Sequence, residues 1–169
     1  MKLSVILSTI PVLAVLGCGS DNGKFTLSSG TYKLSNTSAV APDNCGLATA
    51  FKDGDSIQIT VAGANATFAF GPVDPNRNPV ATIDGNNINS GSKTFDVNDN
   101  DPSIPPLQRV DCVETITETT TGSLVANDQD DGALLYSSVM KSGTQCTAQY
   151  LGYKAYPCSS TLSFMAKKQ

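Results

Sequence analysis

The chain has 169 residues, with 11 Lys and Arg against 15 Asp and Glu, a formal net charge of −4, and it contains no His. The absence of His excludes a Ser-His-Asp triad, a Cys-His pair and any His-ligated metal. The acidic balance argues against nucleic acid as a partner, because binding a phosphate backbone requires a basic surface. A chain of this length fits one domain.

The beginning of the chain has the layout of an export signal. An apolar run over residues 3–16 is too short for a membrane-spanning helix, which needs about 20 residues. It ends in Val15-Leu16-Gly17-Cys18, which resembles the lipobox of bacterial lipoproteins. That resemblance implies cleavage before Cys18 and acylation of its thiol and its new amine. Residues 1–17 are then a signal peptide, and 18–23 are the lipidated Cys and a tether; ordinary cleavage with a free thiol is the alternative.

Acyl chains on Cys18 predict a protein anchored to a membrane of the cell envelope. Gly19 follows the cysteine, in place of the Asp that keeps enteric lipoproteins in the inner membrane. By that sorting rule the protein belongs at the outer membrane.

Residues 24–169 are predicted to form a single β-domain. Periodic helix-forming stretches are almost absent, whereas short alternating runs are separated by turn residues. In residues 56–62, for example, Ile57, Ile59 and Val61 share one face. The predicted strands are 24–27 and 31–35 (one or two strands), 56–62, 66–71, 79–83, 93–98, 109–119 with its continuation 123–126, 133–141, 144–150 and 158–166.

The order of these runs is that of a meander, in which each strand is joined to the next by a hairpin. We therefore predict an antiparallel up-and-down barrel of about eight strands, with a β-sandwich as the alternative. The layout bears a likeness in shape to lipocalin-type barrels. Gly30-Thr31-Tyr32 stands where that family carries a Gly-x-Trp motif, so the likeness concerns shape alone.

Four cysteines remain in the exported domain after Cys18 is set aside, and they predict two structural disulfides. Their spacings contain no C-x-x-C, which argues against a zinc site or a redox dithiol. Proximity along the chain favours pairing Cys146 with Cys158, and this leaves Cys45 to pair with Cys112.

An acidic segment resembles the DxNDNxP sequence that binds Ca²⁺ between cadherin repeats. The resemblance implies that Asp96, Asn98, Asp99 and Asn100 supply oxygen ligands. Asp, Asn and Pro are also ordinary turn residues, and no Glu precedes Glu114 to complete the ligand set. The favoured interpretation is a polar loop, and we predict no metal and no cofactor.

Two glutamates, Glu114 and Glu118, lie four residues apart on a predicted strand and therefore share a face. Facing a lumen, they could hold a cationic ligand or act as an acid and a base. We expect them to face solvent, because an unpaired buried carboxylate is costly.

Three tyrosines, Tyr150, Tyr153 and Tyr156, crowd the segment between Cys146 and Cys158. They could form a contact surface for a partner, since Tyr offers a large rigid area with a polar tip. They could equally form a lid packed over one end of the barrel.

Together these features predict a non-enzymatic, lipid-anchored envelope domain with a structural role or a role in binding a small ligand or an envelope protein. The alternative is a Ca²⁺-dependent adhesion module using residues 96–101; an envelope hydrolase based on carboxylates has the least support. A lumen with apolar walls and a few polar groups favours small-ligand binding, whereas a filled core favours a scaffold or adhesion role.

Overall fold

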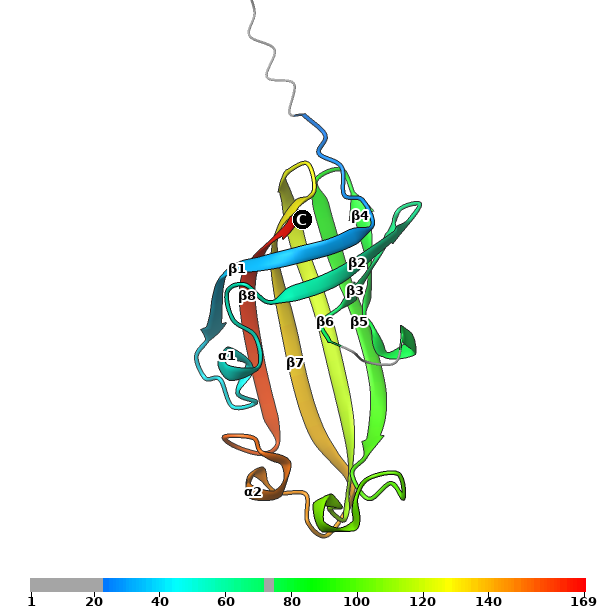
Figure 1. Ribbon diagram of the computed structural model, residues 1–169, viewed down its shortest axis with the longest axis vertical. Helices are drawn as coiled ribbons and strands as arrows, with labels where there is room; N and C mark the ends of the chain where they lie inside the picture. Colours follow the sequence, from blue (N-terminus) through cyan, green and yellow to red (C-terminus); the bar gives the residue numbers. More distant parts are fainter. Residues whose placement is uncertain (1–22, 72–74) are drawn as a thin grey trace, which may run out of the picture.

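The computed structural model describes residues 23–71 and 75–169, which form a closed antiparallel β-barrel (Figure 1). Each strand pairs with the next along the chain, and pairing of the first with the eighth closes the sheet. The predicted up-and-down barrel is confirmed, and the sandwich alternative is excluded. The strands are β1 (Gly30–Val40), β2 (Ser56–Ala62), β3 (Asn65–Ala69), β4 (Val80–Asp84), β5 (Asn87–Asn98), β6 (Cys112–Ala126), β7 (Gln129–Gly143) and β8 (Cys158–Lys168).

The helical segments are single turns in the loops between strands. They are α1 (Leu47–Ala50), η1 (Pro75–Arg77), η2 (Pro106–Gln108) and α2 (Ala148–Leu151).

The strands differ greatly in length. β6 and β7 have 15 residues each, whereas β3 and β4 have 5, which corresponds to about 50 Å against about 17 Å of extended chain. Figure 1 shows β5 to β8 running along the molecule while β1 and β2 cross in front of their upper part. Below that crossing, the segment between β1 and β2, which contains α1, packs against β8 and β1.

The upper part of the barrel is filled by side chains that alternate along the strands. Ile57 and Ile59 of β2 are buried as the sequence predicts, and they pack with Phe68 and Phe164. Phe70 contacts Phe164 edge-on, with ring centroids 5.6 Å apart. This part of the barrel holds a packed core.

One buried charge-bearing group interrupts that core. Asp130 on β7 is 0% exposed, and none of the described residues donates a hydrogen bond to its carboxylate. Burial, and then the neighbouring charge of Asp131, raise the pKa of Asp130 to about 7. A proton held by the folded state and released by the unfolded state makes stability fall as pH rises from about 4 to 7.

Two of the predicted strands are wrong. Residues 24–27 instead cross the upper end of the barrel, where the Phe25 and Thr26 amides donate to the side-chain oxygens of Asn86 and Asn127 at 2.7 and 3.0 Å. These backbone amides therefore find acceptors on the side chains of two turns, where a strand would have found them on a neighbouring strand.

Residues 144–150 form a loop that leads into α2. The strand before it ends at Gly143, whose φ is 114° and whose Cβ position would lie 2.3 Å from the Asp111 carbonyl oxygen. Only glycine fits this close approach, and the backbone leaves the sheet there.

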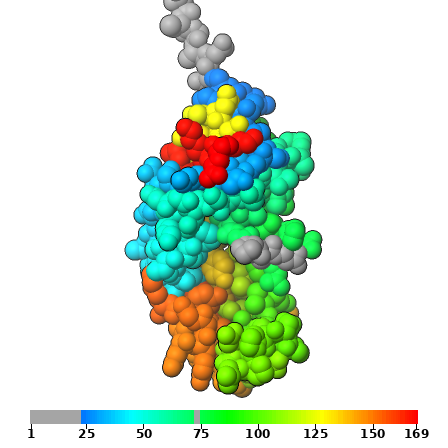
Figure 2. Space-filling model, viewed as in Figure 1, coloured from blue at the N-terminus to red at the C-terminus, as the bar shows by residue number. Residues whose placement is uncertain are grey.

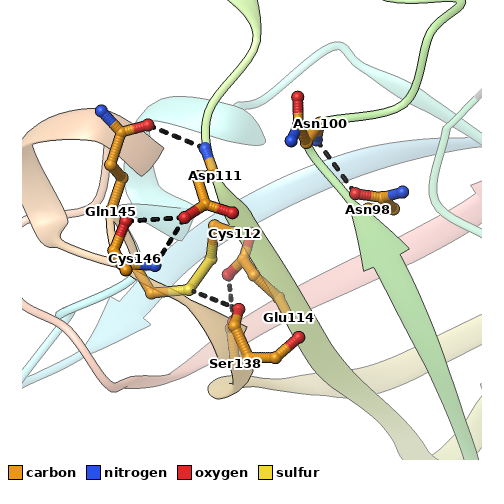
Figure 3. Close-up of a disulfide and its surroundings, with 10 residues drawn as sticks. Asn98, Asn100, Asp111, Cys112, Glu114, Ser138, Gln145 and Cys146 are labelled. Carbon is orange, nitrogen blue, oxygen red and sulfur yellow. Dashed lines mark hydrogen bonds between the residues drawn. A yellow bond between two sulfur atoms is a disulfide. The ribbon is translucent and has the colours of Figure 1, made fainter.

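The disulfides join Cys45 to Cys158 and Cys112 to Cys146, so the pairing predicted from proximity is wrong. The register between β6 and β7 brings Cys112 opposite Gly143, three residues before Cys146. The Asp111 carboxylate fixes this arrangement by accepting hydrogen bonds from the Thr144 amide and hydroxyl at 3.0 and 2.6 Å (Figure 3).

Cys158 begins β8, and the chain that leaves β1 returns along this strand. The Cys45 amide donates to the Ser160 hydroxyl oxygen at 2.8 Å, which places Cys45 beside Cys158. Spatial contact between strands, which proximity in the sequence does not reveal, determines both pairs.

Among the described residues, no helix has both the length and the apolar character that crossing a membrane requires.

Peptide mapping without reduction should recover Cys45 linked to Cys158 and Cys112 linked to Cys146. Replacing the first pair by Ala should destabilise the fold more than replacing the second, because the loops closed span 113 and 34 residues. The chain-entropy relation gives about 5 and about 4 kcal/mol. Urea unfolding of the two double variants checks the order, and a peptide linking Cys146 to Cys158 would contradict the assignment.

Candidate functional site

A pocket of about 250 Å³ lies against the inner face of the long strands. Figure 2 shows a hollow on this side of the molecule, with β7 (gold) at its floor and the segment containing α1 (cyan) at its edge. Its apolar lining comes from α1 and the residue that follows it, from the end of β3 and from β7. These lining residues are Leu47, Ala50, Phe51, Phe70 and Leu134.

The wall that contains α1 is attached to β8 and to the loop before it at several points. Cys45 is bonded covalently to Cys158, and the Asn44 carbonyl accepts hydrogen bonds from the Lys154 and Ala155 amides at 2.9 and 3.1 Å. Asp43 accepts from the Leu47 amide at 2.7 Å. The wall is therefore held in place without belonging to the sheet.

Asp43 also forms an ion pair with Lys154 at 2.8 Å. Burial alone acts to raise the pKa of Asp43, but hydrogen bonds from Lys154, Ser160 and the backbone amides of Leu47 and Ala48 outweigh it and lower the pKa to about 2. At neutral pH this carboxylate is ionised and fixes the start of α1.

Three polar side chains lie among the apolar ones. Glu118 of β6 is paired in register with Tyr136 of β7, so both point to the same face of the sheet. The Tyr136 hydroxyl is 3.0 Å from the hydroxyl of Tyr153, which comes from the loop before β8. Burial raises the pKa of Glu118, and none of the described residues donates a hydrogen bond to its carboxylate. The pocket thus has apolar walls, one carboxylate and two phenol groups.

Farther down the same face, Glu114 is 3% exposed and accepts a hydrogen bond from the Ser138 hydroxyl (Figure 3). Asp99, just beyond β5, lies next to it. Burial first, and then the charge of Glu114 and a hydrogen bond with it, raise the pKa of Asp99 to about 6. Asp99 therefore holds its proton to a higher pH than an exposed Asp, because ionising it in a buried place beside Glu114 is costly.

The expectation that Glu114 and Glu118 face solvent is therefore wrong. They share a face, as their spacing predicts, but it is the inner face. The cost that argued against burial is reduced at Glu114 by a hydrogen bond from the Ser138 hydroxyl. Ser138 is not adjacent to Glu114 in the sequence, so no local pattern of residues indicates this donor.

Two of the three loop tyrosines pack inward and one does not. Tyr153 and Tyr156 are stacked with ring centroids 5.9 Å apart, and Tyr153 also contacts Tyr136. Tyr150 is 54% exposed. Of the two interpretations left open by the sequence, the lid fits Tyr153 and Tyr156, whereas Tyr150 alone remains available as a surface contact.

The residues of the cadherin-like segment do not converge. Asp96 points to the outer face, where it bonds with Lys141 and Thr115, whereas Asp99 contacts Glu114 on the inner side. Asn98 accepts a hydrogen bond from the Asn100 amide at 3.0 Å, the geometry of a local turn. Within residues 23–71 and 75–169, no group of three or more acidic or cysteine side chains is arranged to hold a metal.

The residues of the pocket floor are the ones that the sequence analysis missed. Leu134 and Tyr136 alternate on a predicted strand, which places them on one face. That Glu118 lies beside Tyr136 depends on the register of β6 against β7, which a single sequence does not specify.

Other hollows are open to solvent. A groove of about 570 Å³ outside the barrel carries Lys33, Lys167 and Lys168, and a depression of about 350 Å³ at the upper end is lined by residues such as Lys24 and Phe25. Neither reaches the inner face of the long strands. Cys18, the predicted lipidation site, lies outside the described residues.

Comparison of the chain with protein-family models, with curated proteins and with solved structures finds no match. The interpretation of the site therefore depends on its own geometry and chemistry.

Asp99→Asn should reduce the loss of stability that accompanies a rise in pH from about 4 to 6. The folded pKa of about 6 exceeds the ordinary 3.8, so the folded wild type retains a proton that the unfolded chain releases. The amide supplies a permanent donor, and at pH 7 the variant should be more stable by about 1 kcal/mol, a figure discounted for partial exposure. Urea midpoints measured from pH 4 to 8 test this.

Asp101→Asn is the matched control, because hydrogen bonds from Ser103 lower the pKa of this exposed residue. Asp101→Asn should lose as much stability as the wild type when the pH rises. Asp99→Asn should still lose some stability, because the pKa of Asp130 is also raised. An Asp99→Asn variant that keeps the full wild-type slope would show that the pKa of Asp99 is not raised beside Glu114.

Proposed function

We propose that this protein is a lipid-anchored component of the cell envelope that binds a small, largely apolar ligand in the pocket beside its barrel core, without catalysing a reaction. The single observation that carries the binding role is the pocket itself. Its walls are apolar and it contains a few polar groups that converge, which is the composition of small-molecule sites.

The size of the pocket limits the ligand. A volume of about 250 Å³ lies just below the range of about 300–1,000 Å³ that is usual for drug-sized ligands. A compact molecule with one ring or a short chain suits this space better than a lipid.

An anchor at Cys18 is compatible with access of a ligand to the pocket. Residues 24–27 enter at the upper end of the barrel, where the C-terminus also lies (Figure 1). The pocket opens on the side of the molecule, away from that end (Figure 2). A tether at Cys18 leaves this side accessible from the aqueous phase.

Binding can be tested with three probes that share one apolar body: 2-phenylethanol, 2-phenylethylamine and 3-phenylpropionate. Calorimetry on the full chain should detect saturable binding of at least one of them. Leu134→Trp should weaken that binding at least tenfold, because the larger side chain occupies the floor of the pocket.

Leu135→Trp is the matched control, since Leu135 is the next residue on β7 and is 43% exposed on the outer face. It should leave binding unchanged. If none of the probes binds, or if both variants bind like the wild type, the pocket is not a ligand site and the proposal is wrong.

Cys18→Ser should abolish lipidation and release the protein from membranes, because the resemblance of residues 15–18 to a lipobox makes this thiol the acceptor. Mass spectrometry of the exported protein should show the acyl mass in the wild type alone. Cys146→Ser, which removes a different cysteine, serves as the control and should keep the acyl mass. A Cys18→Ser protein that still fractionates with membranes would contradict the anchor.

A further inference from the structure

We propose that the pocket selects a ligand that carries a positive charge, a primary ammonium on a small apolar body, with the Glu118 carboxylate as its partner. This inference rests on the proposed binding function and names the chemical class of the ligand. It follows from the acidic groups, the aromatic rings and the position of Lys93 on the inner face.

Acidic groups are concentrated along the inner face at and below the pocket. Glu118 lines the pocket, and Glu114 and Asp99 lie on the same side toward the lower end. Tyr136 stands within the field of all three: burial and the charges of Glu114, Glu118 and Asp99 raise its pKa to about 12, despite the opposing effect of a hydrogen bond with Tyr153. The field that disfavours a phenolate favours a cation at the same place.

No basic side chain lines the pocket among the described residues. The carboxylate of Glu118 is half-buried and lacks a hydrogen-bond donor from those residues. A bound ammonium group would donate hydrogen bonds to it and would offset the cost of its burial. A neutral ligand would not offset the cost of burying the Glu118 carboxylate.

Aromatic rings add a second attraction for a cation. The rings of Tyr136 and Tyr153 have centroids 6.5 Å apart and are inclined at 56°, and Phe51 meets Phe70 edge-on at 5.9 Å. All four side chains line the pocket. Ring faces attract an ammonium group, and the same rings pack against its apolar body.

Lys93 is the cation directly opposite Glu118. It lies opposite Glu118 in the register of β5 with β6, so both side chains are on the inner face. Neither residue takes part in the ion pairs found among the described residues, and burial alone accounts for the raised pKa of Glu118. Glu118 is thus not neutralised from within, and removing Lys93 should strengthen binding of a cation.

Protonation sets a pH dependence. The titratable and charged groups around Glu118 include Lys93 from β5, Asp99 just beyond it, Glu114 from β6, Tyr136 from β7 and Tyr153 from the loop before β8. Arg77 of η1 lies over the ring of Phe95, two residues from Lys93 on β5. Burial keeps the phenols of Tyr136 and Tyr153 neutral up to pH 8 and beyond. Affinity for an amine should therefore fall as the pH is lowered and Glu118 and Asp99 take up protons, while affinity for the corresponding alcohol should stay constant.

Calorimetry of the full chain with the three phenyl probes tests the inference. We expect 2-phenylethylamine to bind at least tenfold more tightly than 2-phenylethanol, and 3-phenylpropionate to bind most weakly. Glu118→Gln should remove the preference for the amine and leave the alcohol unchanged, because the amide keeps the size of the side chain without its charge. Lys93→Gln should strengthen amine binding and also leave the alcohol unchanged.

The outcomes separate the inference from the function on which it rests. Equal affinities for amine and alcohol would overturn the cation preference while the pocket remains a binding site. Tightest binding of the anion would overturn it too, and would assign the recognition to Lys93. If none of the probes binds, both proposals fail. Should Glu118→Gln fail to fold, the wild-type comparison of probes and the Lys93→Gln variant still decide the matter.

Discussion

Strand length is the constraint on which the rest of this structure depends. Eight strands close into a ring, but β3 and β4 have 5 residues where β6 and β7 have 15. The short strands can close only the upper part, and there the side chains fill the barrel. The inner face of the longer strands extends farther and must be covered by something other than strands. The segment after β1 covers part of that face where it packs against β8, and the pocket lies between this segment and β7.

The two disulfides hold the parts that the sheet does not. Cys45–Cys158 attaches the covering segment to β8, and Cys112–Cys146 attaches the loop after β7 to the start of β6. Backbone hydrogen bonds between strands already order the barrel, so each covalent link acts where such bonds are absent. In an oxidising compartment, links of this kind can persist.

The inner face of the long strands carries carboxyl groups that a purely structural core does not need. The pKa of Asp99 is raised beside Glu114, and Glu118 is half-buried beside aromatic rings with no hydrogen-bond donor among the described residues. A packed hydrophobic replacement would avoid these desolvation costs. Retention of carboxylates next to a cavity is the arrangement expected where a charge is recognised, and it supports the proposed binding role. Asp130, buried in the filled part of the barrel, shows that not every such group belongs to a site.

The sequence by itself determined the fold class, because alternating runs and turn residues are local signals: β2 occupies the predicted 56–62, and Ile57 and Ile59 are buried as their spacing requires. It also placed Glu114 and Glu118 on a common face and identified the four cysteines that pair. Only the tertiary structure decided which face those carboxylates occupy, which cysteines meet, and that Tyr136 lies beside Glu118. Each of these depends on the register between strands and on the path of the covering loop. Register is set by the packing of the whole barrel, and no short stretch of the chain contains that information.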